Sequence, residues 1–175
     1  MADALQQQQR YLAQLLEAVQ RCAYFLNHSE SRMEWPLRGI DLAAKRKDAS
    51  LFEALAAINE RFAKLQDTLA AVMRHTALLM GEQPQSFLQI LSFFEKLGVL
   101  ESSERWQQGR IVRNMAAHEY ETDYDAIAEH FNTLVSLTPL LNETARHLIN
   151  RIDQDLDISP ATDDFKEEFA RIFDK

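Results

Sequence analysis

The chain has 175 residues, with 19 Lys and Arg against 27 Asp and Glu, a formal net charge of -8, and 46% hydrophobic residues. This length suits one domain with a sizeable core. The acidic balance argues against a protein that binds nucleic acid over its whole surface, because clustered Lys and Arg drive phosphate binding. It leaves room for a small, locally basic cleft.

The sequence also lacks the marks of export or membrane insertion. No apolar run reaches transmembrane length, and the N-terminal stretch has no basic region followed by a hydrophobic core. The lone cysteine, Cys22, cannot form an intramolecular disulfide, which fits a reducing compartment. We therefore expect a soluble, cytoplasmic protein that makes no contact with a membrane.

The first two helices are predicted from apolar spacing in a chain with only 4 Gly and 4 Pro. The first should run from Asp3 or Ala4 to about Asn27, with residues 27–31 acting as a stop. Residues 32–48 should form an irregular connection that Trp35, Leu37 and Ile40 could pin to the core. A second, long helix should follow, capped by Asp48 or Ser50 and ending near Met80, before Gly81 and Pro84.

Three further helices and a tail complete the prediction. A short helix covers about 85–97, and a fourth begins near Ser102 or Ser103. After a polar turn at 119–123, a fifth is capped by Thr122 or Asp123 and should kink at Pro139. A tail at 158–175 is amphipathic and should dock on the bundle or reach a partner. Nothing alternates with period two, so we expect an all-α, up-and-down bundle of four to five main helices in residues 1–157, plus a short C-terminal helix.

The most informative segment runs from Arg113 to Tyr120 and ends in Asn114-x-x-x-His118-x-Tyr120. An arginine can hold a phosphate through paired hydrogen bonds, and a histidine moves protons near neutral pH. On a straight helix, however, residues five apart point about 140° apart. They can converge only if the helix ends or bends, or if a second subunit completes the site. For the spacing alone, the ordinary alternative is an arginine bonded to a carbonyl and a histidine near a helix end.

Other charged residues add little to this segment. Arg105, Arg110 and Arg113 could form a local positive patch that touches RNA. The cluster at 45–47 is more typical of a solvated loop. The remaining histidines have no metal-binding spacing, and no Gly-rich phosphate loop is present, so we expect neither a metal nor a cofactor. Those histidines are His28, His75, His130 and His147.

Together, these features resemble the HEPN superfamily and, more narrowly, its HepT-like toxin branch. The likeness rests on Arg113, Asn114, His118 and Tyr120 without a gap, on residues 93–100 (Phe-Phe-Glu-Lys-Leu-Gly-Val-Leu) and on 61–67 of the long second helix. It covers about 12–148; the 32–48 segment and the tail look like additions.

The resemblance implies an all-α homodimer in which Arg113 and His118 of two subunits line one cleft. It implies a metal-independent endoribonuclease toxin whose cognate antitoxin is a minimal nucleotidyltransferase. In that branch the tyrosine matching Tyr120 receives AMP, which silences the toxin. Asn114 would orient the catalytic groups or the phosphate, or would simply cap the helix end. Two alternatives stay open: a non-catalytic subunit that presents a nucleotide or other substrate to a nucleotidyltransferase, and a purely structural helical dimer.

Overall fold

The computed structural model describes residues 2–115 and 122–174, and within these ranges it contains seven helices and no β-strand. Five of the helices have ten or more residues, and a short helix follows them, which confirms the predicted all-α class. The helices are α1 (Ala2–Ser31), α2 (Gly39–Ala44), α3 (Ala49–Leu79), α4 (Phe87–Lys96), α5 (Ser103–Met115), α6 (Tyr124–Leu156) and α7 (Lys166–Arg171).

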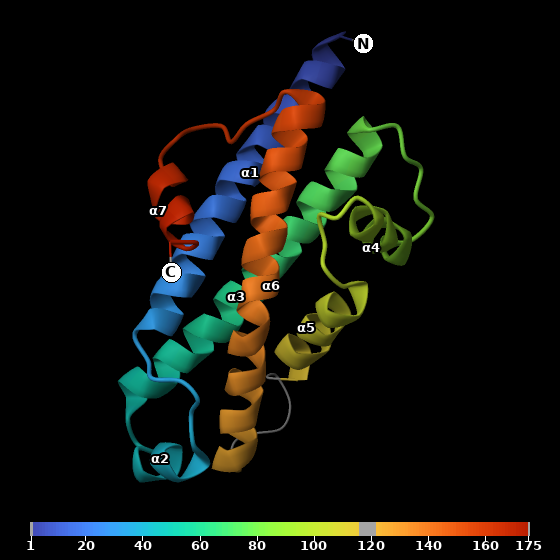
Figure 1. Cartoon of the computed structure of the whole chain (residues 1–175). Helices are drawn as coiled ribbons and strands as arrows, with labels where there is room; N and C mark the ends of the chain where they lie inside the picture. Colours follow the sequence, from blue (N-terminus) through green and yellow to red (C-terminus); the bar gives the residue numbers. More distant parts are fainter. Residues whose placement is uncertain (1, 116–121, 175) are drawn as a thin grey trace.

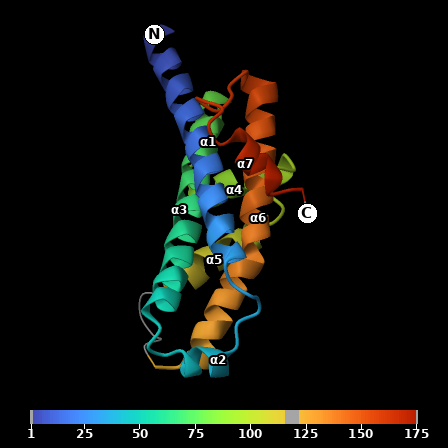
Figure 2. The same cartoon turned by 90° about the vertical axis from the view of Figure 1, so that its left-hand side faces the viewer.

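The long helices run alternately up and down (Figure 1). From the N-terminus α1 descends, α3 returns, α4 and α5 together descend, and α6 returns beside them. The helix α3 packs against α1, α4, α5 and α6, so it forms the centre of the bundle. Turned by 90°, the long helices α1, α3 and α6 lie side by side, with α2 closing the lower end (Figure 2).

The core joins α5 firmly to α3. Trp106 of α5 and Phe62 of α3 are both fully buried. The buried side chain of Gln66 donates a hydrogen bond from Nε2 to the Trp106 carbonyl at 2.8 Å. One turn later Gly109 lies so close that a β-carbon there would sit 3.3 Å from the Phe62 ring. The absence of a side chain at this position therefore lets the two helices approach.

Several predicted helix ends are confirmed. Asp48, Ser102 and Asp123 each accept hydrogen bonds from backbone N–H groups in the first turn of α3, α5 and α6. Gly81 and Gly98 follow α3 and α4 with φ of 84° and 71°, the left-handed conformation that glycine adopts without strain. Among these caps, Ser102 fixes where α5, the helix that contains Arg113, begins.

The stop predicted at residues 27–31 is wrong, because α1 continues to Ser31. The polar side chains in this stretch bond to the helix instead of ending it. Asn27 donates from Nδ2 to the Ala23 carbonyl at 2.8 Å, and Ser29 donates to the Phe25 carbonyl at 3.0 Å. Asn27 also exchanges hydrogen bonds with Asn142 of α6, both at 3.0 Å. Partners on the same helix and on its neighbour thus override the local turn preference.

The prediction of a wholly irregular 32–48 connection is also wrong, since it contains α2. Trp35 and Leu37 pack on the core as expected. Ile40 does not, because it is 73% exposed, while Leu42 is 2% exposed and takes the anchoring role.

This connection is held against the start of α6. The side chain of Asn132 accepts from the Leu37 N–H at 2.7 Å and donates to the Leu37 carbonyl at 2.9 Å. Gly39 touches the beginning of α6 so closely that a β-carbon would lie 1.9 Å from Asp125 Oδ1. The segment is therefore a packed part of the bundle.

The tail docks on the bundle, one of the two arrangements that its amphipathic pattern allowed. Phe169 is 6% exposed and belongs to the core, and Phe165 lies against Tyr24 and Phe25 of α1. The Ala161 N–H donates to the Ala13 carbonyl at 3.0 Å. Pro139 lies inside α6, and the helix continues on both sides of it.

Candidate functional site

The structure places Arg110, Arg113 and Asn114 in the last turns of α5. Arg110 and Asn114 are exposed. The other two residues of the motif, His118 and Tyr120, lie outside the described residues, as does most of the turn expected at 119–123. The described geometry therefore concerns the arginine end of the motif and the surfaces on either side of it.

Arg113 is held by α3. Its side chain is 10% exposed; Nη1 donates to the Ala63 carbonyl at 2.8 Å, and Nη2 donates to the Asp67 carboxylate at 2.8 Å. The carbonyl contact is the one expected of an ordinary helix-end arginine. Nε is buried and has no hydrogen-bond partner in the part that the structure describes. A guanidinium has five N–H donors, so Nη1 and Nη2 of this fixed arginine each retain one donor for an anion.

A second set of hydrogen bonds links the same end of α5, through α3, to α6. Asn59 of α3 donates from Nδ2 to the Arg113 carbonyl at 3.4 Å, and its Oδ1 lies 3.1 Å from His130 Nε2. His130 is 7% exposed and packs edge-on against Phe131, with the ring centroids 4.8 Å apart. From the sequence, His130 was grouped with the histidines that have no metal-binding spacing. Its position on the apolar face of α6, beside Phe131, was the signal of burial.

Beside His130 a hollow of about 470 Å³ lies between the end of α5 and the start of α6. It borders both ends of the 116–121 segment in sequence, at Met115 and Asp123. Its described lining is Val112, Met115, Asp123, Ala126, Glu129, His130 and Thr133. Two carboxyl groups and an imidazole suit proton transfer better than phosphate binding. Within the described ranges, no group of three or more His, Cys, Asp or Glu is arranged to hold a metal ion.

Burial lowers the pKa of His130 below its ordinary value of 6.5, because desolvation disfavours the charged ring. In the unfolded chain the ring protonates as the pH falls below about 6.5, while in the folded chain it stays neutral to lower pH. We therefore expect the free energy of unfolding to decrease as the pH falls from about 6.5 to the lowered pKa. His130→Gln, which can still donate to Asn59, should flatten that slope in urea unfolding curves. The exposed His28→Gln is the control; an unchanged slope in His130→Gln would contradict the assignment.

The expected basic patch is mostly neutralised. Arg105 pairs with Glu101 at 3.0 Å, and its side chain is 40% exposed. Arg113 pairs with Asp67. Of the three arginines named from the sequence, Arg110 alone forms no ion pair within the described residues.

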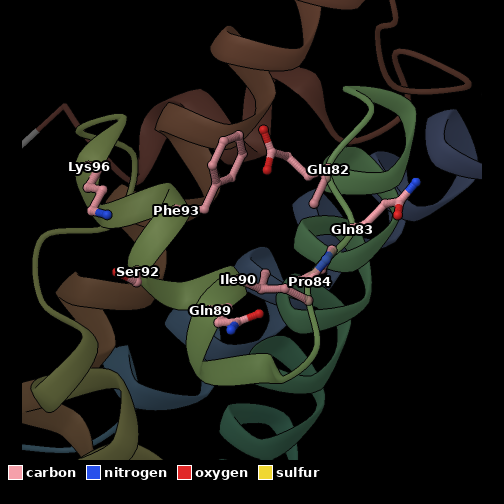
Figure 3. Close-up of a pocket in the computed structure, with 9 residues that line it drawn as sticks. Glu82, Gln83, Pro84, Gln89, Ile90, Ser92, Phe93 and Lys96 are labelled. Carbon is pink, nitrogen blue, oxygen red and sulfur yellow. The ribbon is translucent and has the colours of Figure 1, made fainter.

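Another hollow, of about 310 Å³, lies between α4 and the loop that follows α3 (Figure 3). Glu82, Gln83 and Pro84 come from the loop, and residues from Gln89 to Lys96 come from α4. Its lining mixes one acid, one base and neutral groups, and it includes no residue of the motif. We assign it no role in the site.

No protein-family model, no curated protein and no solved structure matches this chain. None of the helices in the described ranges combines the length and apolar character needed to cross a lipid bilayer.

Proposed function

We propose that this protein is a metal-independent endoribonuclease toxin of the HepT-like type, with its active site at the interface of a homodimer. The observation that carries the proposal is the gap-free run Arg113-Asn114-x-x-x-His118-x-Tyr120. Its first residues lie at the end of α5 in an all-α, up-and-down bundle.

The surroundings of Arg113 support a role in phosphate binding. The arginine is fixed by two contacts with α3, so its guanidinium needs little reorganisation when a phosphate arrives. The outer face of α5 supports the dimer. Ile111 and Met115 are 62% and 46% exposed and lie one helical turn apart, on the side of α5 opposite Arg113, which faces α3. An apolar strip at that place suits contact with a second copy of α5.

The chemistry follows from the residue types. One His118 takes the proton from a ribose 2′-hydroxyl, and the freed oxygen attacks the neighbouring phosphorus. Arg113 stabilises the negative charge that builds on the phosphate oxygens. The His118 of the other subunit donates a proton to the departing 5′-oxygen, so the bond to that oxygen breaks. The products are a 2′,3′-cyclic phosphate and a 5′-hydroxyl. No metal or cofactor takes part.

Tyr120 is the proposed off-switch. Transfer of AMP from a partner nucleotidyltransferase to its phenol would add bulk and negative charge two residues from His118, and both would repel RNA. Intact mass before and after co-expression with a minimal nucleotidyltransferase tests this step. Tyr120→Phe serves as the control.

The nuclease itself is tested by incubating the purified protein, free of AMP, with RNA in excess EDTA and by identifying the ends produced. We expect 2′,3′-cyclic phosphate and 5′-hydroxyl ends, and loss of cleavage in His118→Ala. No cleavage, or cleavage that EDTA abolishes, would disprove the proposal.

A second candidate is a non-catalytic subunit that presents a nucleotide or another substrate to a nucleotidyltransferase. The ion pair between Arg113 and Asp67 favours it, because a carboxylate already occupies one edge of the guanidinium. So does the net charge of -8, which opposes RNA binding in general. A stable complex with the transferase, without RNA cleavage in any state of Tyr120, would identify this alternative.

A further inference from the structure

A basic hollow of about 290 Å³ lies in the groove between α1 and α3, away from the motif. Arg21, Cys22 and Phe25 line it from α1, and Arg61 and Lys64 line it from α3. Three of these five side chains are cations, and none is an acid. In a chain with a net charge of -8, such a concentration of one sign needs a physical reason.

The three cations are not neutralised by ion pairs. Every ion pair within the described residues involves other partners. Glu17 and Glu60 stand one turn before Arg21 and Lys64 on their helices, yet neither pairs with them. Because the three cations line one hollow, their like charges repel one another, and an anion in the hollow would relieve that repulsion.

The hollow is partly preformed. The guanidinium carbons of Arg21 and Arg61 each lie 5.6 Å from the centroid of the Phe25 ring. Arg61 also donates to the Phe25 carbonyl at 3.2 Å and to the Ser29 hydroxyl. Arg61 is therefore fixed, whereas Arg21 and Lys64 are exposed and can close on a ligand. The site offers a rigid cation, two adjustable cations and an aromatic ring.

The position of the hollow relates it to Arg113. Arg61 and Lys64 line the hollow beside α1, whereas Ala63 and Asp67 accept hydrogen bonds from Arg113 of α5. Ala63 lies two residues, or about 200°, from Arg61 around the helix, whereas Lys64 and Asp67 are three residues, or about 60°, apart and are both exposed. Arg61 to Asp67 spans about 9 Å along the helix. Figure 1 shows α1 and α5 on opposite sides of α3. The hollow and Arg113 thus lie at the same level of α3, and the exposed Lys64 and Asp67 lie next to each other on the surface between Arg61 and Ala63.

We propose that this basic hollow binds the phosphate backbone of single-stranded RNA and anchors a strand that crosses α3 toward Arg113. Arg21, Arg61 and Lys64 contact the phosphates, and Phe25 supplies an apolar floor for a sugar or base. The inference rests on the proposed nuclease function, for which it supplies a second contact with the substrate outside the motif.

The first test measures binding of a labelled, single-stranded 2′-O-methyl RNA by fluorescence anisotropy at several salt concentrations. This RNA lacks the 2′-hydroxyl that the reaction uses, so binding is read without cleavage. Arg21→Glu/Lys64→Glu should weaken binding about tenfold and reduce the salt slope by about 1.4, which corresponds to two lost contacts. Arg10→Glu/Lys47→Glu changes the net charge equally at exposed positions outside the hollow and should bind almost as the natural protein does.

The second test uses Cys22, the single cysteine of the chain, as a reporter inside the hollow. Burial raises the pKa of its thiol, so alkylation by neutral iodoacetamide is followed at alkaline pH. The RNA should slow the alkylation severalfold. Inorganic phosphate at the same phosphate concentration should slow it far less, because it lacks the neighbouring contacts.

Three results would overturn the inference: equal weakening in the two double variants, no weakening in either, or an alkylation rate that RNA leaves unchanged. Equal protection by inorganic phosphate would overturn it too, since the hollow would then be a site for free anions. If the protein still cleaves RNA when one of these results is found, only the RNA-anchoring role of the hollow is disproved, and the nuclease proposal stands. If the RNA binds and protects Cys22 as expected but ordinary RNA is not cleaved, the nuclease proposal is disproved, and the RNA-binding role of the hollow stands.

Discussion

Replacing His118 by alanine is expected to reduce the rate of RNA cleavage by at least about 100-fold, because a positioned general acid or base contributes roughly 10² to 10⁴ to a rate. In the proposed dimer each cleft contains two copies of His118, so the single substitution removes acid and base together. Single-turnover cleavage, with the variant in excess over RNA, measures the chemical step directly. Anisotropy with 2′-O-methyl RNA should show nearly unchanged binding.

The neighbouring arginine supplies the matched controls. Arg113→Ala should lose activity and also some stability, because it gives up the contacts with Ala63 and Asp67. Asp67→Asn removes the ion pair but keeps the arginine. Since the Asp67 side chain is 66% exposed, the pair should contribute no more than about 1 kcal/mol to stability. Asp67→Asn should therefore keep or gain activity. Activity in His118→Ala within a factor of three of the natural protein would refute the proposed chemistry.

Replacing Trp106 by alanine should lower the free energy of unfolding by about 3–5 kcal/mol, the usual range for removing a buried aromatic ring. Trp106 is fully buried and lies between α5 and its neighbours, with the Phe87 ring 6.4 Å away. For a domain of this size, such a loss corresponds to a melting temperature lower by roughly 10 °C. Because the residue fixes the helix that carries Arg113, cleavage should also become more sensitive to temperature.

Trp106→Phe separates packing from hydrogen bonding. The indole Nε1 is buried without a hydrogen-bond partner in the described residues, so losing it should cost nothing beyond volume. Gln66 bonds to the main-chain carbonyl and keeps its partner in both variants. We expect the phenylalanine variant to lose less than half as much stability as the alanine variant, in urea unfolding followed by circular dichroism. Equal losses would contradict the view that packing of the aromatic ring accounts for the stabilisation.

Periodicity in the sequence was enough to predict the long helices, and the caps were readable from Asp48 and Asp123. The errors came where polar residues find partners far away in the sequence. Asn27 looked like part of a stop because its hydrogen bond with Asn142 spans 115 positions. The choice between Ile40 and Leu42 depended on how α2 sits on α6, which spacing within so short a helix does not reveal.

The site was predictable in its residue types and not in its contacts. The motif named Arg113, and the sequence left open whether it would bond to a carbonyl or face a phosphate; it bonds to Ala63 and to Asp67 of α3. Nothing local indicates an ion pair across 46 positions. His130 and the basic hollow were missed for the same reason, since each draws on residues from separate helices.

The length of the three principal helices has a practical consequence for the proposed dimer. With 30, 31 and 33 residues, α1, α3 and α6 are each about 45–50 Å long. A compact domain of this size has a radius of gyration of about 16 Å, which corresponds to a sphere about 41 Å across. The bundle is longer than a sphere of the same mass (Figures 1 and 2), and an elongated monomer elutes from a sizing column ahead of a compact one. Light scattering and sedimentation equilibrium measure molar mass independently of shape. They will therefore give the number of subunits correctly where the elution volume overstates it.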